Sequence, residues 1–314
     1  MDLYCYDAPH GNFGDDLNFW FWDQMLPGWR DVRPDDLLVG VGTLINDGLP
    51  KGRKKLVIGS GAGYGPLPGA DLMAECQFEA VRGPRSAAAL GLPPEKGIVD
   101  PAVMLSEFPE FRGLPRSGRP IFVPHEASMH RNDWAKLCTA AGVDYVSPGD
   151  DAKLVISRLA TAPLVIAESM HAVIIADAFG TPWHAVSISH LFNGTKWLDW
   201  ADSIDLSLKI EPLYPLMDKI ARRLPKASAD SVSRRGGSTV GAADASPKPK
   251  GPARGGRLPL RLRVRMEVEA LMTSSRLRKL VATKGSLSNR AALTRAKERY
   301  QAVIDRVHAD FQGT

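Results

Sequence analysis

The fold is decided by the stretch Leu164-Val165-Ile166-Ala167-Glu168-Ser169-Met170-His171-Ala172-Val173-Ile174-Ile175-Ala176-Asp177. Its first four residues form an apolar run that predicts a buried strand, and the rest predicts a helix. Ser169 is suited to cap the start of that helix and Gly180 to end it, because serine accepts from free backbone N–H groups and glycine tolerates the left-handed conformation. Glu168 and His171 therefore stand where a strand passes into a helix. In parallel α/β sheets this edge holds ligand sites, and a helix N-terminus favours anions.

The same alternation of strand and helix runs through most of the chain, and it predicts parallel βαβ units with helices on both sheet faces. A loop rich in proline, glycine and arginine, from Phe108 to Pro120, separates two such series. We therefore expect an α/β protein with two Rossmann-like domains and a cleft between them, spanning residues 1–115 and 116–223. The expected strands are Leu3–Tyr6, Leu37–Gly42, Lys55–Gly59, Phe78–Arg82, one that ends at Asp100-Pro101, Ile121–Val123, Asp144–Val146, Leu164–Ala167 and Ala185–Ile188. The expected helices include Asp16–Met25, one from Pro84 to Gly91, Asn132–Ala141, Asp150–Ala160 and the one from Ser169.

Composition narrows the class of protein. The chain has 314 residues, of which 44% are hydrophobic, enough for two cores of moderate size. No run approaches the roughly 20 apolar residues of a membrane span, and the first residues have no signal-like character, so we expect a cytoplasmic protein. The cysteines are widely separated and show no paired spacing, which argues against a disulfide framework or a zinc site. We expect Cys5, Cys76 and Cys138 to be reduced.

Charge is distributed unevenly along the chain. Residues 221–314 carry 21 Lys and Arg against 7 Asp and Glu, whereas residues 1–220 carry 19 against 28. Within the basic part, residues 224–259 predict a disordered linker and residues 260–314 a basic helical tail. The tail could contact an anionic membrane, present a solvated helix face, or pack back on the first domain. We expect no nucleic acid as a partner, because no aromatic residues interleave with the cations.

Glu168 and His171 are the sharpest candidate pair. Three residues apart at a helix start, they can act as an acid and a base, or the imidazole can bind an anion beside free backbone N–H groups. The alternative is that Glu168 caps local backbone and His171 is a satisfied core imidazole. One E-x-x-H pattern is no metal signature without further ligands, so no metal site is expected.

Other candidates lie at similar junctions. Arg82 stands where a strand gives way to a helix, and its fork suits a carboxylate or phosphate, or else a surface ion pair with a residue such as Glu79. Gly61 belongs to a glycine-rich loop whose N–H groups suit an anion, but prolines follow where a dinucleotide-binding helix would begin. His125 ends a strand and either points into the cleft or is merely exposed.

An aromatic segment follows Lys196. Trp197 and Trp200 flank Asp199, and aromatic rings at such positions can stack on a sugar face. Core packing is the commoner role of tryptophans at this spacing, and we weigh it above sugar contact.

Several short segments occur in a characteristic order over most of the first 206 residues. They are Gly11-Asn12-Phe13-Gly14-Asp15-Asp16-Leu17-Asn18, Val41-Gly42-Thr43, Gly59-Ser60-Gly61-Ala62-Gly63-Tyr64, Val81-Arg82-Gly83-Pro84, Asp100-Pro101-Ala102, Pro124-His125-Glu126, the Glu168 to Asp177 helix and Lys196 to Trp200. In these segments the chain resembles the polysaccharide pyruvyl transferase family, particularly the branch that attaches pyruvate ketals to bacterial exopolysaccharides such as succinoglycan. The resemblance rests on the shared order of these segments.

The resemblance implies a glycosyltransferase-B-like pair of Rossmann domains that uses phosphoenolpyruvate as donor substrate, without a nicotinamide or a metal. The acceptor would be a saccharide, and a lipid-linked one would place the protein at the inner face of the membrane. Carried over, Arg82 and His171 would grip the phosphate and carboxylate of the donor, with His125 as a further candidate. The residues expected to bind substrate are Arg82, Arg85, Ser169, Gly61, Asn12, Lys196, Trp197 and Trp200.

The chain departs from the family at one position. Many members have an arginine two residues before the helix histidine, where this chain has Ser169. Another cation must then supply part of that charge, and Arg85 and Lys196 are the candidates.

Transfer of a 1-carboxyethylidene group sets the chemistry that the site must perform. The methylene carbon of the donor is protonated, two sugar hydroxyls attack in turn, and phosphate departs. This requires an acid, a base and cations around the phosphate. We expect His171 as acid or phosphate ligand, Glu168 as its orienting or basic partner, and Asp15 or His125 as the acceptor-side base.

Two other functions are compatible with the same sequence. A glycosyltransferase that uses a nucleotide sugar has the same architecture, and fold alone does not separate the two activities. A non-catalytic, membrane-associated assembly factor would use the basic tail for docking.

Overall fold

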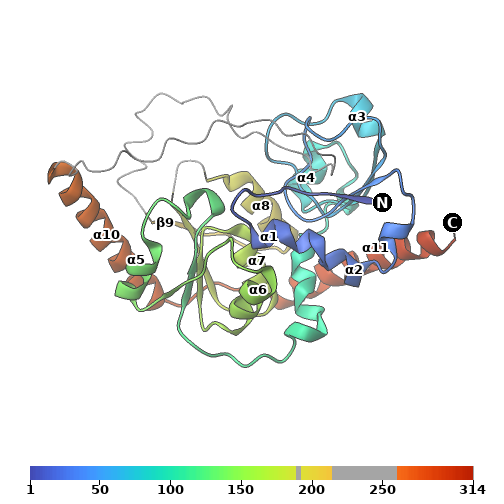
Figure 1. Ribbon diagram of the computed structural model, residues 1–314. Coiled ribbons are helices and arrows are strands. Elements are labelled where there is room, and N and C mark those ends of the chain that lie inside the picture. The colour runs from blue at the N-terminus through green and yellow to red at the C-terminus, as the bar shows by residue number, and fades with distance from the viewer. Residues whose placement is uncertain (189–191, 214–259, 314) are drawn as a thin grey trace.

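Figure 1 shows the computed structural model of the chain, which describes residues 1–188, 192–213 and 260–313. Two parallel sheets carry the core, one from each half of the chain. The predicted α/β class with parallel sheets is therefore confirmed. The domain boundaries at residues 115 and 223 stay a prediction, and the predicted disordered linker 224–259 lies outside the described residues.

The first sheet has four strands in the order β1-β2-β3-β4, and four of the predicted strands match them to within a few residues. The strand predicted to end at Asp100-Pro101 is wrong, because the segment before η4 forms only an isolated bridge between Val81 and Gly97. The prediction of one continuous helix over Asp16–Met25 is wrong, because this part of the chain forms three short helical segments. The break coincides with buried Asn18, whose side-chain amide exchanges hydrogen bonds with the backbone of Val41 at 2.9 and 3.0 Å. Hydrogen bonds between a side chain and the backbone compete with the regular hydrogen bonding of an α-helix. The elements of this half are β1 (Asp2–Tyr4), α1 (Phe13–Asp16), η1 (Leu17–Phe19), α2 (Phe21–Met25), η2 (Trp29–Asp31), β2 (Leu37–Val39), β3 (Lys55–Ile58), α3 (Ala70–Ala74), β4 (Cys76–Ala80), α4 (Pro84–Ala89), η3 (Pro94–Lys96), η4 (Pro101–Glu107) and η5 (Pro109–Phe111).

The second sheet has five parallel strands in the order β6-β5-β7-β8-β9, so the strand of the deciding stretch lies at its centre. The helix that follows is buried along its whole length. Ser169 caps it by accepting from the N–H of Ala172 at 3.4 Å, and Gly180 follows its end with φ +67°. Both sequence predictions for these ends are confirmed. The elements are β5 (Ile121–Val123), η6 (Glu126–Ser128), α5 (Trp134–Ala141), β6 (Asp144–Tyr145), α6 (Ala152–Thr161), β7 (Val165–Ala167), α7 (Met170–Ala178), β8 (Trp183–Ser187), α8 (Gly194–Ser203) and β9 (Ile210–Pro212).

The C-terminal helices run along both halves of the molecule (Figure 1). α10 (Leu260–Val281) packs against α5, and α11 (Arg290–Gln312) packs against β4 and η4. The buried phenol of Tyr300 donates to the carbonyl of Ile58 at 2.5 Å. The predicted helical tail is therefore confirmed, and it packs on the body of the protein. None of the helices in the described part of the chain combines the length and apolarity needed to cross a bilayer.

Candidate active site

The candidate residues come together where strands of both sheets end. Asn12 and Asp15 lie at the start of α1, in the segment that follows β1. His125 follows β5, Glu168 follows β7, and Lys196 lies on α8. These side chains belong to one group, because Lys196 acts electrostatically on both Asp15 and His125. The candidate residues thus gather at the carboxyl edges of parallel strands, where ligand sites of such folds commonly lie.

Glu168 accepts hydrogen bonds from the backbone of neighbouring segments. Its carboxylate is 2% exposed and accepts from the N–H of His125 at 3.2 Å and from the N–H of Ile188 at 2.8 Å. It thereby joins the ends of β5 and β8 to the end of β7. This is the capping role weighed in the sequence, and the acid–base role of Glu168 stays a prediction.

His171 is wedged between the two halves of the chain. Its ring lies so close to Gly14 of α1 that any added Cβ there would come within 2.0 Å of Nδ1. On its other edge, Nε2 lies 3.8 Å from Oδ2 of Asp100. Burial lowers the pKa of His171 to about 3, helped by the charges of Lys196 and Arg82. The imidazole is therefore neutral at pH 7, and it is not the satisfied core histidine of the alternative interpretation, because Nε2 has no hydrogen-bond partner among the described residues.

Asp15 is a carboxyl group poised to hold a proton near neutral pH. Burial raises its pKa to about 7, although the nearby charge of Lys196 lowers it. The amide of Asn12 donates to the same carboxyl group. Asn12 also caps α1 by accepting from the N–H of Gly14 at 3.3 Å. Asn12 therefore fixes Asp15 and orders the loop that presents it.

Lys196 is the buried cation of the site. The side chain is 8% exposed, and Nζ donates to the hydroxyl of Tyr64 at 3.0 Å, 5.4 Å from the centre of that ring. No carboxylate of the described residues lies within ion-pair distance of it. Burying an ammonium without a counter-charge is costly. Of the two candidates for the charge missing at Ser169, Lys196 is the one that lies in the site.

A small cavity opens beside Lys196. Its volume is about 30 Å³, and its walls include Tyr64, His125, Glu168 and Trp197. His125 accepts from the N–H of Ala127 through Nδ1 at 3.1 Å, which leaves Nε2 as the protonated nitrogen. Burial and Lys196 lower the pKa of His125 to about 3, so this imidazole is also neutral at pH 7.

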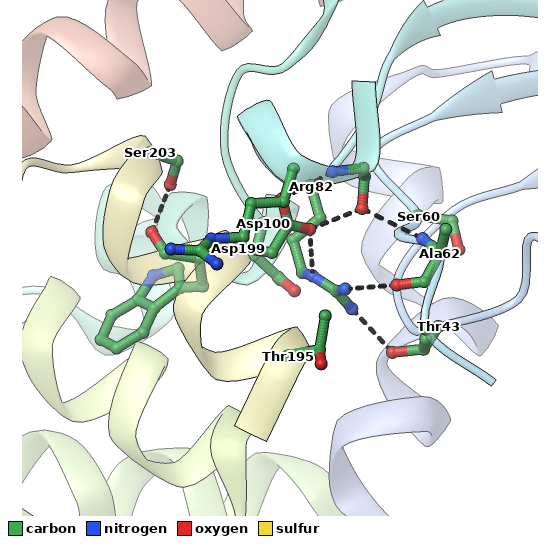
Figure 2. A network of polar contacts seen from close by, with 12 residues as sticks. Thr43, Ser60, Ala62, Arg82, Asp100, Thr195, Asp199 and Ser203 are labelled. Carbon is green, nitrogen blue, oxygen red and sulfur yellow. Dashed lines mark hydrogen bonds and ion pairs between the residues drawn. The ribbon is translucent and has the colours of Figure 1, made fainter. Parts of the chain in front are cut away.

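Arg82 joins the two halves of the protein (Figure 2). The side chain is 0% exposed, and Nε bonds to Oδ2 of Asp199 on α8 at 3.0 Å. The remaining nitrogens donate to Thr43 Oγ1 at 2.6 Å and to the carbonyl of Ala62 at 3.0 Å. The alternative expectation, a surface ion pair between Arg82 and Glu79, is therefore wrong. A grip on the donor phosphate stays a prediction, and the geometry does not favour it because the guanidinium is occupied by protein acceptors.

The glycine-rich loop around Gly61 packs against the side chain of Arg82. A Cβ at Gly61 would lie 2.2 Å from the guanidinium carbon of Arg82, and the N–H of Gly61 donates to the carbonyl of Gly42 at 3.0 Å. The N–H of Ala62 donates to Ser86 Oγ at 3.0 Å. Glycine is thus needed here for close packing, and these two N–H groups are not free for a ligand.

Three other expected binding residues lie outside the group. Arg85 pairs at 2.6 Å with Asp202 at the surface between α4 and α8. Trp197 and Trp200 are 0% exposed, which supports the core interpretation of both rings over sugar stacking. Trp197 reaches the site only as part of the cavity wall.

Sequence reasoning missed three residues of this region. Asp100 and Tyr64 stood in segments noted only for their family-like order, and Asp199 was noted only for its neighbouring tryptophans. Nothing in the spacing links Asp199 to Arg82, which lies 117 positions earlier. Buried partners at such separations become visible only in the folded chain.

The pair on α8 offers a matched test of stability. Asp199→Ala leaves the buried Arg82 without its counter-ion and should lower the free energy of unfolding by about 3–5 kcal/mol. Asp202→Ala, which breaks the half-exposed pair between Arg85 of α4 and Asp202 of α8, should cost less than about 1 kcal/mol. Urea unfolding measures both, and equal losses would contradict the role assigned to the Arg82–Asp199 pair.

Comparison with known proteins places this geometry in a family. The chain is 40% identical to the succinoglycan biosynthesis protein ExoV of Rhizobium meliloti (strain 1021), over 326 aligned positions that cover 99% of this chain and 100% of that protein. A model of the family described as polysaccharide pyruvyl transferase matches residues 2–190, which include Asp15, His125, Glu168 and His171. The chain belongs to the polysaccharide pyruvyl transferase family.

Proposed function

We propose that this protein transfers the enolpyruvate-derived group of phosphoenolpyruvate onto two hydroxyls of a sugar in an exopolysaccharide precursor, forming a pyruvate ketal and releasing phosphate. Family membership supports a transferase of this class. The observation that carries the donor assignment is Lys196, a buried ammonium without a carboxylate partner among the described residues. The phosphate and carboxylate of phosphoenolpyruvate would supply the negative charge that Lys196 lacks.

The reaction balances without a redox step, and we propose that it uses neither a nicotinamide nor a metal. A proton adds to the methylene carbon of the donor and turns it into a methyl group, which leaves a cationic centre at C2. One sugar hydroxyl bonds to C2 and loses its proton. Phosphate then departs, and the second hydroxyl bonds to C2 and loses its proton, which closes the ketal.

The protonation states of these side chains at neutral pH indicate which step of the reaction each of them can perform. Asp15 has a pKa of about 7, so a fraction of the protein molecules carry a protonated Asp15 at neutral pH. This carboxyl group suits the role of acid at the methylene carbon of the donor. His125 and His171 are neutral. The Nε2–H of His125 suits donation to the phosphate, because its Nδ1 already accepts from Ala127, whereas His171 suits proton uptake from a hydroxyl. Lys196 binds the anionic groups, and Glu168 positions the backbone.

Donor binding requires the site to open. The cavity of about 30 Å³ is much smaller than the roughly 300–1,000 Å³ of typical small-molecule sites. Tyr64 and Lys196 come from the two halves of the chain and close this cavity together. We infer that the two halves part to admit the donor and close over it.

The acceptor is proposed to be lipid-linked, and α10 offers a surface for the membrane that would carry it. Leu271 is 68% exposed on the side of α10 that faces away from α5, with Val268 and Met272 exposed beside it. The opposite side holds buried Leu277. The exposed apolar residues lie on a helix with six Lys and Arg against two Glu, which suits an anionic lipid surface.

Lys196→Met should raise the KM for phosphoenolpyruvate by about tenfold to a hundredfold, because it removes a charge-assisted contact. Lys136→Met, an exposed lysine on α5, is the control and should leave KM unchanged. Phosphate release with a saccharide acceptor gives KM, and thermal unfolding gives ligand binding directly. Stabilisation by a nucleotide sugar but not by phosphoenolpyruvate would contradict the proposal and favour a glycosyltransferase.

The pH dependence tests Asp15 as the acid. Only the protonated carboxyl donates, so kcat/KM should fall as the pH rises through about 7, the pKa of this group. Because Lys196 lowers the pKa of Asp15, Lys196→Met should move this fall to higher pH. Asp15→Asn should abolish turnover, and an unchanged profile in Lys196→Met would assign the titration to another group.

Leu271→Glu should weaken binding to vesicles containing phosphatidylglycerol by about tenfold or more, since it removes apolar burial and adds repulsion. Leu154→Glu on α6 is the matched control, because Leu154 is 56% exposed and lies on another element. Co-sedimentation measures binding. Equal binding of both variants would show that α10 is not the docking surface.

A further inference from the structure

Asp100 and His171 face each other across the boundary between the two halves of the chain. Asp100 stands directly before η4, and His171 lies in the first turn of α7, which packs on η4. His171 Nε2 and Asp100 Oδ2 are 3.8 Å apart, and neither atom has a hydrogen-bond partner among the described residues. Buried polar atoms are nearly always paired. Two unpaired atoms that face each other therefore point to an interaction that forms in another state of the site.

The Asp100 carboxylate is held so that only one oxygen is free. Oδ1 accepts from the N–H of Ala102 at 3.0 Å and caps η4. The following Pro101 packs against the backbone of Gly59, where an added Cβ would lie 2.1 Å from the proline ring. Asp100 is 0% exposed. Its free oxygen, Oδ2, is therefore presented to His171 by a rigid support.

The charges around His171 oppose its protonation. Lys196, Arg82 and His125 all lower its pKa, in addition to burial. Within the described residues, Asp100 is the one carboxylate at ion-pair distance from the ring. Asp100 itself has a pKa raised to about 6 by burial, against the N–H of Ala102 and the charge of Arg82. It is therefore ionised at neutral pH and suited to support a positive imidazole.

The other charged groups near Asp100 act on its pKa in opposite directions. Asp199 raises its pKa and Lys196 lowers it, while Asp100 in turn raises the pKa of Tyr300. The phenol of Tyr300 donates to the carbonyl of Ile58, so it does not compete for Oδ2. His171 is thus the remaining donor that Oδ2 can meet among these groups.

We propose that Asp100 is a positioning residue for His171, accepting a hydrogen bond from Nε2–H and supporting the imidazolium that forms when Nδ1 takes a proton from an acceptor hydroxyl. The proposal rests on the proposed function. The proton leaves the sugar oxygen as that oxygen bonds to C2 of the donor, and Nε2–H stays directed at Asp100. Movement of about 1 Å shortens the gap to a hydrogen bond. Parting of α1 from α7, which uncovers Nδ1 from Gly14, accompanies the opening that admits substrate.

The tautomer of His171 tests this independently of activity. In Asp100→Asn, the side-chain oxygen keeps the bond from Ala102, so the amide nitrogen faces Nε2 and donates to it. The ring proton should then move from Nε2 to Nδ1, as expected when a histidine loses its orienting carboxylate. Nitrogen NMR of ring-labelled histidine, in the presence of inorganic phosphate, reports the tautomer, and His171→Gln assigns the signal. The same tautomer in wild type and Asp100→Asn would overturn the proposal.

Kinetics supply the second readout. Asp100→Asn should lower kcat by about 10²- to 10⁴-fold with little change in the KM for phosphoenolpyruvate. The double variant with His171→Gln should be no slower than His171→Gln alone, because residues that act as a unit are not additive. Independent, multiplying losses would overturn the proposal. Absence of any turnover with phosphoenolpyruvate in wild type would refute the proposed function and leave the NMR result to decide on Asp100.

Asp177→Asn is the matched control for burial. Asp177 is a 0% exposed carboxyl on the same helix as His171, and it bonds to Trp183, Ser288 and Arg290 away from the site. This variant should lower the melting temperature and leave both the tautomer of His171 and kcat of the folded enzyme unchanged. A shifted tautomer in Asp177→Asn would show that any buried carboxyl on this helix has the same effect, which contradicts a specific role for Asp100.

Discussion

The buried ion pair between Arg82 and Asp199 is the constraint on which the site depends. It joins the first sheet to α8 of the second half with side chains that are 0% and 2% exposed. Asp199 also accepts from the N–H of Ser86 at 2.9 Å, so it binds the first turn of α4 as well. Lys196 lies one helical turn before Asp199 on α8. Fixing Asp199 therefore fixes where the ammonium of Lys196 meets Tyr64.

A buried ion pair does not stabilise a protein much, because desolvation offsets the attraction. Its value lies in geometry, since a guanidinium with several acceptors defines one arrangement of its surroundings. The close approach of Gly61 to Arg82 and of Gly83 to Asp199 shows how tightly the backbone fits this pair. The result is a cluster that places one ammonium, two neutral imidazoles and a protonatable carboxyl between the halves. That combination is what the proposed donor, an anion whose methylene carbon is protonated, would require.

The sequence predicted the features that depend on local pattern. The apolar run before Glu168, the cap at Ser169 and the stop at Gly180 follow from short-range preferences, and all were confirmed. The use of each polar side chain was harder to foresee. Glu168 was singled out by its position at the end of a strand, yet both of its oxygens bind backbone N–H groups that follow neighbouring strands. Such bonds depend on the strand order in the sheet, which the chain order of the strands does not contain. For the same reason Asp100 was missed, and Arg82 was assigned a surface or ligand partner instead of Asp199.

Transfer in heavy water shows whether the methylene carbon of the donor takes a proton from the solvent. In the proposed reaction, the methylene carbon of phosphoenolpyruvate takes one solvent-derived proton and C2 ends bonded to two sugar oxygens. A saccharide product formed with phosphoenolpyruvate in D₂O should therefore carry a pyruvate ketal whose methyl group holds one non-exchangeable deuterium, with one phosphate released per ketal. Mass spectrometry and carbon NMR of the product decide this. A product that retains an unsaturated enolpyruvyl ether, or a methyl group without deuterium, would contradict the account.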